Sequence, residues 1–180
     1  THTTSNNMSL TNENIIQTLS QKFTPKVENF HITHDMLAFE VKKEHLIEVI
    51  KFLKEDQTMN FNFLTDVCGV HYPDYDTNRQ FCVVYHLHNW FENIRVRIKV
   101  FLPATNPEVE SIVSLYPGAN WQERETYDFY GITFKNHPQL KRILNMDEME
   151  SFPLRKEFPL EDQGRTDKDD RFFGRTGPNC

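Results

Sequence analysis

The stretch Trp121-Gln-Glu-Arg-Glu-Thr-Tyr-Asp-Phe-Tyr-Gly131 combines charged side chains, aromatic rings and a terminal glycine more densely than any stretch before it. Asn120 stands where an N-cap residue is expected, and Glu123 three residues later completes a capping box. Gly131 is well suited to end a helix in a left-handed conformation. The sequence therefore predicts a helix of about ten residues in this stretch.

Two segments rich in proline and basic residues follow the predicted helix. The first runs from His137-Pro138 to Leu140-Lys-Arg-Ile-Leu144, and the second is Phe152-Pro-Leu-Arg-Lys-Glu-Phe-Pro-Leu160. In this order, the helix and the two segments resemble the signature of the 30 kDa (C-type) subunit family of the respiratory NADH–quinone oxidoreductase (complex I). The strand-rich first part of the chain is compatible with that family.

The residues that carry the resemblance are the candidate partner-contact residues of this chain. They are Glu123, Arg124, Glu125, Asp128, Phe129, Tyr130, Gly131, His137, Pro138, Arg142, Pro153, Leu154, Arg155, Lys156, Phe158 and Pro159. Gln139, Lys141 and Glu157 depart from the family pattern, which has an acid, an arginine and an aspartate at these places. The resemblance implies no catalytic, cofactor-binding or metal-binding residue.

The resemblance implies a non-catalytic structural and assembly subunit in the peripheral arm of a proton-translocating enzyme. The whole complex transfers electrons from NADH through FMN and iron–sulfur centres to a quinone. By resemblance, this chain docks on the D-type quinone-site subunit and lies close to the B-type iron–sulfur subunit. It is then expected peripherally on the cytoplasmic side of the bacterial inner membrane, with no cofactor of its own.

Two alternatives stay open. Subunits of this type also resemble components of membrane-bound hydrogenases and ferredoxin-linked complexes, and the sequence does not identify the electron donor. The second alternative is a free-standing hydrolase that uses the carboxylates of Glu123, Glu125 and Asp128 as an acid–base set. The sequence shows no nucleophile, phosphate loop or metal cluster beside them, so we favour a solvated or inter-subunit helix face with Arg124 as counter-ion.

Length and composition favour one acidic domain. The 180 residues are enough for a real core, and the net charge of −6 argues against a nucleic-acid binder. No apolar run approaches the roughly twenty residues of a spanning helix, and we expect no signal peptide. Cys68, Cys82 and Cys180 form no Cys-x-x-Cys pair, which favours reduced thiols over a zinc or iron–sulfur site.

Periodicity predicts an α+β fold, with a mostly antiparallel sheet, helices packed on one face and an extended C-terminal arm. Helices are expected at Thr11–Phe23 with Thr11 as N-cap, at Glu44–Lys54 with Leu46, Ile47, Ile50 and Leu53 buried, and from Asn106 towards Tyr116. Strands are expected at Val27–Ile32 and Met36–Val41, joined near His34-Asp35 as a hairpin, and at Asn60–Tyr72, Gln80–His88 and Ile94–Leu102. Asn60–Tyr72 carries apolar residues on both faces, so we expect it to be central.

The sequence divides into three regions. Residues 1–9 are polar and are expected to be a disordered tail, and residues 10–144 are expected to form the globular domain. From Asn145 to Cys180 helical and strand periodicity disappear while several phenylalanines persist. Because a loop of this length is unusual inside a compact domain, residues 145–180 are predicted to be an extended arm that binds partner subunits.

Histidines and basic residues outside the helix have simpler interpretations. His86 and His88 lie two apart on a strand and share a face, with His71 as the nearest third metal ligand in the sequence, but a wet strand face is favoured. His137 precedes a proline and is expected to anchor a turn rather than carry a proton. Arg155 and Lys156 are expected to form an ion pair with a partner rather than an anion or lipid site.

Overall fold

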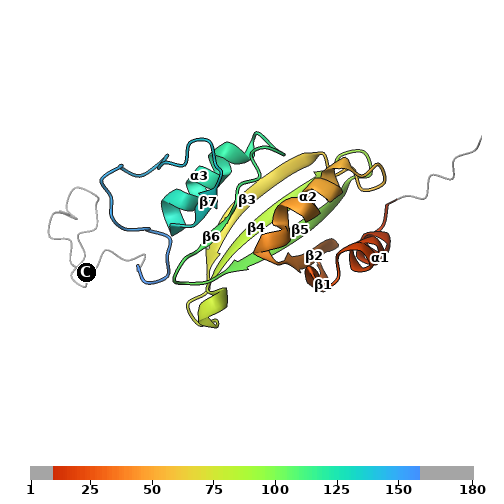
Figure 1. Cartoon of the computed structure of the whole chain (residues 1–180), viewed down its shortest axis with the longest axis horizontal. Helices are drawn as coiled ribbons and strands as arrows, with labels where there is room; N and C mark the ends of the chain where they lie inside the picture. The colour runs from red at the N-terminus through yellow and green to blue at the C-terminus, as the bar shows by residue number, and fades with distance from the viewer. Residues whose placement is uncertain (1–9, 159–180) are drawn as a thin grey trace, which may run out of the picture.

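The computed structural model describes residues 10–158, in which five strands form one sheet and two short strands form a second (Figure 1). The α-helices are α1 (Asn12–Phe23), α2 (Leu46–Glu55) and α3 (Ala119–Tyr130). The large sheet contains β1 (Val27–Thr33), β2 (Met36–Val41), β3 (Phe63–His71), β4 (Phe81–Asn89) and β5 (Ile94–Leu102). The small sheet contains β6 (Glu108–Glu110) and β7 (Thr133–Lys135), and the 3₁₀ turns are η1 (Lys43–His45) and η2 (Thr77–Arg79).

The N-terminal helix and hairpin confirm the sequence prediction. Thr11 caps α1, since its Oγ1 accepts a hydrogen bond from the backbone N–H of Asn14 at 3.3 Å. The turn between β1 and β2 places His34 at φ 51° and Asp35 at φ 61°. Positive φ at both central residues is the geometry of a type I′ hairpin turn, which matches the natural twist of the two strands.

Helix α2 presents an apolar stripe to the core. Leu46, Val49, Ile50 and Leu53 are all fully buried, which confirms the predicted helix and three of its four predicted core positions. Ile47 is only partly buried, and Val49 takes the fourth position. The α-helix also begins later than predicted, because the preceding residues form η1.

The strand order of the large sheet is β1-β2-β5-β4-β3, so β5 is central. Strands β2 and β5 pair in parallel, and the other neighbours are antiparallel. The prediction that Asn60–Tyr72 forms a central strand is wrong, because β3 lies at an edge. Two features explain why β3 carries apolar residues on both faces. Helix α3 covers one face, and the register shift between Leu64 and Asp66 changes which face the following side chains point to.

All three helices pack on the same face of the large sheet, which confirms the predicted fold class. Val83 and Tyr85 of β4 belong to the same buried cluster as the apolar side chains of α1 and α2. Gly69 on β3 pairs with Val83, so both residues face this side. A Cβ at Gly69 would lie 2.6 Å from Tyr130 Cδ2 and 3.0 Å from Thr126 Cγ2, so α3 also lies directly against it. Figure 1 shows α2 across the front of the sheet and α3 beside β3.

The predicted helix from Asn106 is wrong. Glu108–Glu110 is instead the short strand β6, which pairs in parallel with β7, and a turn follows it. The apolar face expected for that helix was Val109, Ile112, Val113 and Tyr116. Three of these side chains are buried, through a strand and a turn, and Val113 is only partly buried. The backbone N–H of Ile112 donates to Glu123 rather than to a helical carbonyl, so a long-range contact overrides the local pattern.

Residues 136–158 contain neither helix nor strand. Residues 145–158 of the predicted arm lie against α3, with the N–H of Leu154 donating to the carbonyl of Phe129 at 3.2 Å. The rest of the predicted arm and the predicted tail at residues 1–9 lie outside the described residues. None of the helices within residues 10–158 has the length and apolar character needed to cross a membrane.

Candidate functional site

Helix α3 ends at the predicted residue, but its N-terminal cap differs from the prediction. Gly118 is the N-cap residue and offers no side-chain cap. The predicted cap by Asn120 and its capping box are therefore wrong, because Asn120 lies inside the first turn. Gly131 ends the helix at φ 71°, and its N–H donates to the carbonyl of Tyr127 at 2.8 Å, as the left-handed C-cap prediction requires.

Glu123 is fully buried and ties α3 to the segment after β6. Its Oε1 accepts a hydrogen bond from the N–H of Ile112 at 2.8 Å, and its Oε2 accepts one from the Ser111 hydroxyl at 2.6 Å. Burial raises the pKa of the Glu123 carboxyl to about 7, although the two hydrogen bonds lower it in part. The side chain therefore stabilises the fold and is not solvated.

His137 lies against the same helix end. Its side chain is buried, and its Nε2 lies 3.2 Å from the carbonyl oxygen of Asn120 and 4.0 Å from Glu123 Oε2. Its Nδ1 accepts a hydrogen bond from the N–H of Gln139 at 3.0 Å, which anchors the turn at Pro138. This geometry supports the predicted role of turn anchor.

Replacing Glu123 by glutamine should flatten the pH dependence of stability. In the unfolded chain this carboxyl loses its proton near its ordinary value of 4.5, whereas the folded protein retains the proton up to about pH 7. Between these values the unfolded state binds fewer protons, so the free energy of unfolding falls as pH rises, by about 2–3 kcal/mol. Glutamine does not titrate and should remove this loss.

Urea unfolding at about pH 5 and about pH 8 measures the effect. Glu125→Gln is the matched control, because Glu125 is exposed on the same helix and should keep the wild-type slope. An unchanged slope in Glu123→Gln would show that Glu123 is ionised throughout this range.

Arg124 is buried and binds carbonyl groups of its own chain. Its Nε donates to the carbonyl of Lys141 and its Nη2 to the carbonyl of Arg142, both at 3.2 Å. The guanidinium carbon lies 5.1 Å from the ring centre of Trp121. The prediction of a solvated α3 face with Arg124 as counter-ion is therefore wrong for Glu123 and Asp128, whose side chains are buried and bind other groups. Glu125 is exposed, as that prediction requires.

Asp128 is the centre of a dense set of hydrogen bonds. Its Oδ2 accepts the backbone N–H groups of Ile143, Leu144 and Asn145 at 2.8–3.0 Å. Its Oδ1 accepts the Asn145 side-chain amide at 3.0 Å and Arg142 Nη1 at 2.8 Å. Burial alone would raise the pKa of Asp128, but these donors outweigh it and hold the pKa well below its usual range. The carboxylate stays charged and fixes the segment from Arg142 to Asn145 on α3.

Arg142 extends this clamp to the start of the predicted arm. Besides its ion pair with Asp128, its Nη2 donates to the carbonyl of Ser151 at 3.1 Å and to the carbonyl of Met149. Its guanidinium also lies 5.0 Å from the ring centre of Phe152. One side chain therefore connects α3, the segment after β7 and residues 149–152.

The second motif packs on the end of α3. Arg155 Nε donates to the carbonyl of Tyr130 at 2.7 Å, and the guanidinium lies 4.7 Å from the ring centre of Phe152. The N–H of Lys156 donates to His71 Nδ1 on β3 at 3.0 Å. The two motifs recognised in the sequence are therefore parts of one structural unit.

The remaining candidate residues are available at the surface to different degrees. Glu125, Pro138, Leu154, Lys156 and Phe158 are exposed, whereas Phe129, Tyr130 and Pro153 are partly buried. Pro159 lies outside the described residues. The structure thus separates buried members of the signature, which hold the chain to itself, from exposed members that stay predicted partner contacts.

The three carboxylates of the hydrolase alternative point into separate surroundings. Glu123 binds Ser111 and Ile112, and Asp128 binds the segment after Arg142. Glu125 lines a cavity of about 150 Å³ between β3 and α3, together with Asp66. The acid–base set therefore does not converge on one cavity, and its two buried members are fully engaged in structural hydrogen bonds.

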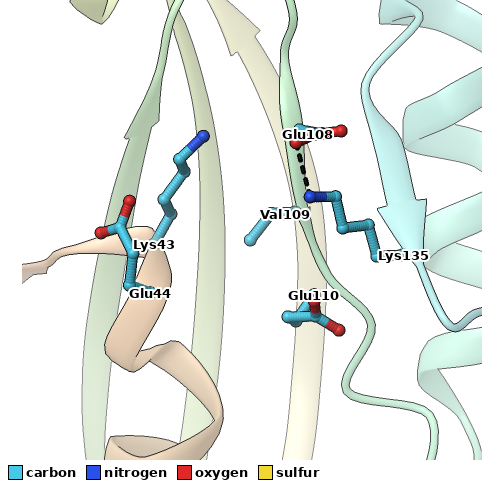
Figure 2. A pocket seen from close by; sticks show the side chains of 6 residues that line it. All are labelled: Lys43, Glu44, Glu108, Val109, Glu110 and Lys135. Atoms are coloured by element: carbon cyan, nitrogen blue, oxygen red, sulfur yellow. Dashed lines mark ion pairs between the residues drawn. The ribbon is translucent and has the colours of Figure 1, made fainter.

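Figure 2 shows a second, smaller cleft, of about 110 Å³, between η1 and the β6–β7 pair. Its lining residues are Lys43, Glu44, Glu108, Val109, Glu110 and Lys135. Glu108 and Lys135 form an ion pair of 2.5 Å within the wall made by β6 and β7. The opposite charges satisfy one another, so we assign no ligand to this cleft.

The histidines of the metal alternative lie on two sides of the sheet. His86 Nε2 accepts a hydrogen bond from Arg97 Nε at 2.9 Å, and His88 Nε2 lies 3.2 Å from Asn93 Oδ1. His71 faces the other side, stacked on Phe81 at 4.6 Å between ring centres. Within residues 10–158, His, Cys, Asp and Glu side chains form no group of three or more placed to hold a metal ion.

Ser111 and Asn145 are structural members of this unit that the sequence did not suggest. Ser111 binds Glu123 from outside the motif, and Asn145 contributes two donors to Asp128 from the predicted boundary of the arm. A serine or asparagine in a turn-rich segment carries no distinctive pattern. Only the contacts made over long sequence distances identify them.

Comparison with known proteins shows a consistent similarity. Residues 39–164 match the family model described as "Respiratory-chain NADH dehydrogenase, 30 Kd subunit". The chain is 43% identical over 161 residues to a C-type NADH-quinone oxidoreductase subunit of Rhizobium etli, covering 89% of this chain and 82% of that protein. It is 42% identical over 134 residues to the C-type subunit of Streptomyces coelicolor, covering 74% of this chain and about half (53%) of that protein's length.

Solved structures with a similar fold agree with this. The trypsin-resistant fragment of Nqo5 aligns with a TM-score of 0.59 and 30% identity, covering 71% of this chain and 98% of the fragment. A chain of the membrane-bound sulfane sulfur reductase, an archaeal respiratory membrane complex, aligns with a TM-score of 0.70, covering 87% of this chain and 95% of that chain. At 23% identity this second similarity shows the fold alone.

Proposed function

Because the chain belongs to the family of the 30 kDa subunit of the respiratory-chain NADH dehydrogenase, we propose that it is a non-catalytic structural subunit of such a complex. In this proposal the assembled complex transfers electrons from NADH to a quinone and couples this to proton transport. The chain sits in the peripheral arm, on the cytoplasmic side of the bacterial inner membrane. Its partners are the D-type quinone-site subunit and the B-type iron–sulfur subunit.

The observation that carries the proposal is the clamp formed by the two family motifs. Asp128 and Arg142 hold residues 142–151 on α3, and Arg155 continues this contact to the helix end. Leu154, Lys156 and Phe158 are left exposed beside the clamp. We propose that this partly apolar surface, which the buried charges hold in place on α3, and the predicted arm at residues 145–180 contact the partner subunits.

FMN and the iron–sulfur centres belong to other subunits in this proposal. Cys68 and Cys82 are the two cysteines among the described residues, and both are free. Burial raises the pKa of the Cys68 thiol to about 11 and that of the Cys82 thiol to about 12. Because the thiolate is the form that ligates metal, these thiols suit a structural role.

The test is affinity purification of the tagged chain from native membranes in mild detergent. We expect iron–sulfur and membrane subunits to co-purify, together with NADH–quinone oxidoreductase activity. Co-purification with hydrogen-linked or ferredoxin-linked activity would assign the chain to a related membrane-bound complex, as the fold shared with the archaeal membrane complex allows. Recovery of the stable chain alone would contradict the proposal.

A further inference from the structure

One face of the large sheet has no α-helix of the described residues over it, since α1, α2 and α3 all pack on the other side. At one end of this face, Arg79 of η2 lies 3.9 Å from the ring centre of Phe101. We call this face of the sheet the open face. Its members follow from the strand register: His88 pairs with Arg95, His86 with Arg97, and Val84 with Lys99. Residues directly opposite in an antiparallel pair point to the same side. The open face thus has β5 along its middle.

The middle of the open face is positively charged. Arg95, Arg97 and Lys99 point out of β5 at intervals of about 7 Å, the spacing of alternate strand residues. Arg95 is exposed, and the other two are partly buried. Within residues 10–158, Arg95 and Lys99 take part in no ion pair, while the chain as a whole has a net charge of −6. The row is therefore a locally positive region on a protein whose net charge is negative.

The carboxylates of the open face flank this middle row, and Glu40 on β2 is the register neighbour of Lys99. Asp66 stands on the edge strand β3, 3.7 Å from His86 Nδ1. Glu40 on β2 is already paired with Arg79 at 2.8 Å. Within the described residues, the positive charges of Arg95 and Lys99 are therefore not neutralised by an ion pair, and the groups on either side of the row are acidic or neutral.

Exposed aromatic rings adjoin one end of the cationic row. Phe63 pairs with His88, which in turn pairs with Arg95. The ring centres of Phe63 and Trp90 are 5.9 Å apart, and those of His88 and Trp90 are 5.5 Å apart. Phe63 is 48% exposed and Trp90 is 66% exposed. Tryptophan, other aromatic residues and arginine are the side chains that contribute most to protein–protein binding.

We propose that the open face docks an acidic surface of another protein subunit of the assembly. Carboxylates of that partner face Arg95 and Lys99, and its apolar side chains pack on Phe63 and Trp90. The inference rests on the proposed function, which supplies the assembly. It adds a second docking surface on the side of the sheet away from α2, and it specifies the chemistry of the partner.

The charge pattern disfavours other occupants. A second copy of the chain related by a two-fold axis would present the same face, and the cationic rows of the two β5 strands would oppose each other. An anionic lipid surface would meet the carboxylates of Asp66 and Glu28 at the two borders of the sheet. A partner protein can instead match positive and negative groups one by one.

The test reverses the charge of the row in the intact complex. Tagged chain carrying Arg95→Glu and Lys99→Glu is expressed in place of the wild type, and the complex is purified from native membranes in mild detergent. We expect recovery of partner subunits per tagged chain to fall about tenfold or more, because like charges across an interface are strongly unfavourable. Arg97 and Arg79 are left unchanged, since both have partners within the fold.

The control carries Lys22→Glu and Lys51→Glu, which change the net charge by the same amount at exposed lysines of α1 and α2, on the other side of the sheet. It should recover partners as the wild type does. A second variant, Trp90→Ala, should also weaken recovery while leaving the thermal unfolding of the purified chain unchanged. The same thermal measurement on the charge-reversed chain separates loss of docking from loss of folding.

The outcomes separate this inference from the proposed function. Wild-type recovery from a folded charge-reversed variant would overturn the docking face and leave the proposed function standing, whereas a wild-type chain without partners would overturn the proposed function. Two further results would overturn the inference: charge-sensitive binding of the isolated chain to phosphatidylglycerol–phosphatidylcholine vesicles with normal co-purification, or a dimer of the isolated chain that the reversal dissociates.

Discussion

Replacing Asp128 by asparagine is expected to destabilise the domain by about 3–5 kcal/mol, the usual cost of breaking a buried ion pair. The Asp128 carboxylate accepts three backbone N–H groups, one side-chain amide and one guanidinium. An asparagine side chain loses one acceptor oxygen and brings its own N–H groups towards these donors. Arg142 would also be left with a buried charge and no carboxylate.

Two measurements distinguish this effect from general loss of stability. Urea unfolding gives the free energy, and hydrogen exchange at residues 141–152 reports release of the clamped segment from α3. Glu125→Gln is the control on the same helix, and as an exposed substitution it should lie within about 0.5 kcal/mol of the wild type. An Asp128→Asn protein as stable and as protected as the wild type would contradict the central role of this carboxylate.

The partner of Asp128 allows a second check. Arg142→Ala should be destabilising by itself, because it leaves the Asp128 carboxylate without its counter-ion. Residues that share one network are not additive, so the double variant Asp128→Asn, Arg142→Ala should cost less than the sum of the single changes. Full additivity would indicate that the two side chains act independently.

Replacing Gly131 by alanine should cost about 2–4 kcal/mol, from left-handed backbone strain and from overpacking. Gly131 has φ 71°, which disfavours any residue with a Cβ. An added methyl group would also lie 2.5 Å from Phe152 Cε2 and 2.6 Å from Arg155 Nη2. Both are part of the second motif, so the substitution should also loosen residues 152–158.

Gly118→Ala is the matched control for the Gly131 substitution. It lies at the other end of α3 with φ −62°, and no atom lies within 4 Å of the position that a Cβ would take. Alanine fits the backbone of Gly118 and restricts the unfolded chain, but it is a poorer N-cap than glycine, so stability should stay within about 0.5 kcal/mol of the wild type. Thermal unfolding of the two variants side by side measures the difference, and equal melting temperatures would contradict the prediction.

The sequence predicted the elements whose pattern is local. Thr11 as the cap of α1, the turn at His34-Asp35 and Gly131 as the end of α3 all depend on neighbours in the chain, and the structure confirms them. The errors have a different origin. The segment after Asn106 shows helical spacing, but pairing with β7 and the Glu123 carboxylate draw it into a strand and a turn.

The resemblance to the family predicted which residues belong to the candidate site. It did not predict which groups these residues bind. Nothing in the spacing of Glu123, Arg124 and Asp128 reveals that the first two are buried against different segments and that the third binds four residues far along the chain. The predicted cap by Asn120 failed because the helix begins earlier, at Ala119, and Glu123 binds Ser111 instead of completing a capping box. Contacts of this kind appear only in three dimensions.

The parallel pairing of β2 with β5 has a consequence for biosynthesis. Residues 37–40 pair with residues 96–99, and β3 and β4 are synthesised between them. The β1–β2 hairpin therefore leaves the ribosome long before the strand that completes its sheet, and it must wait with one edge unpaired. The β3–β4–β5 meander can form from consecutive strands once β5 has emerged, and its β5 edge is then the template on which the earlier hairpin docks.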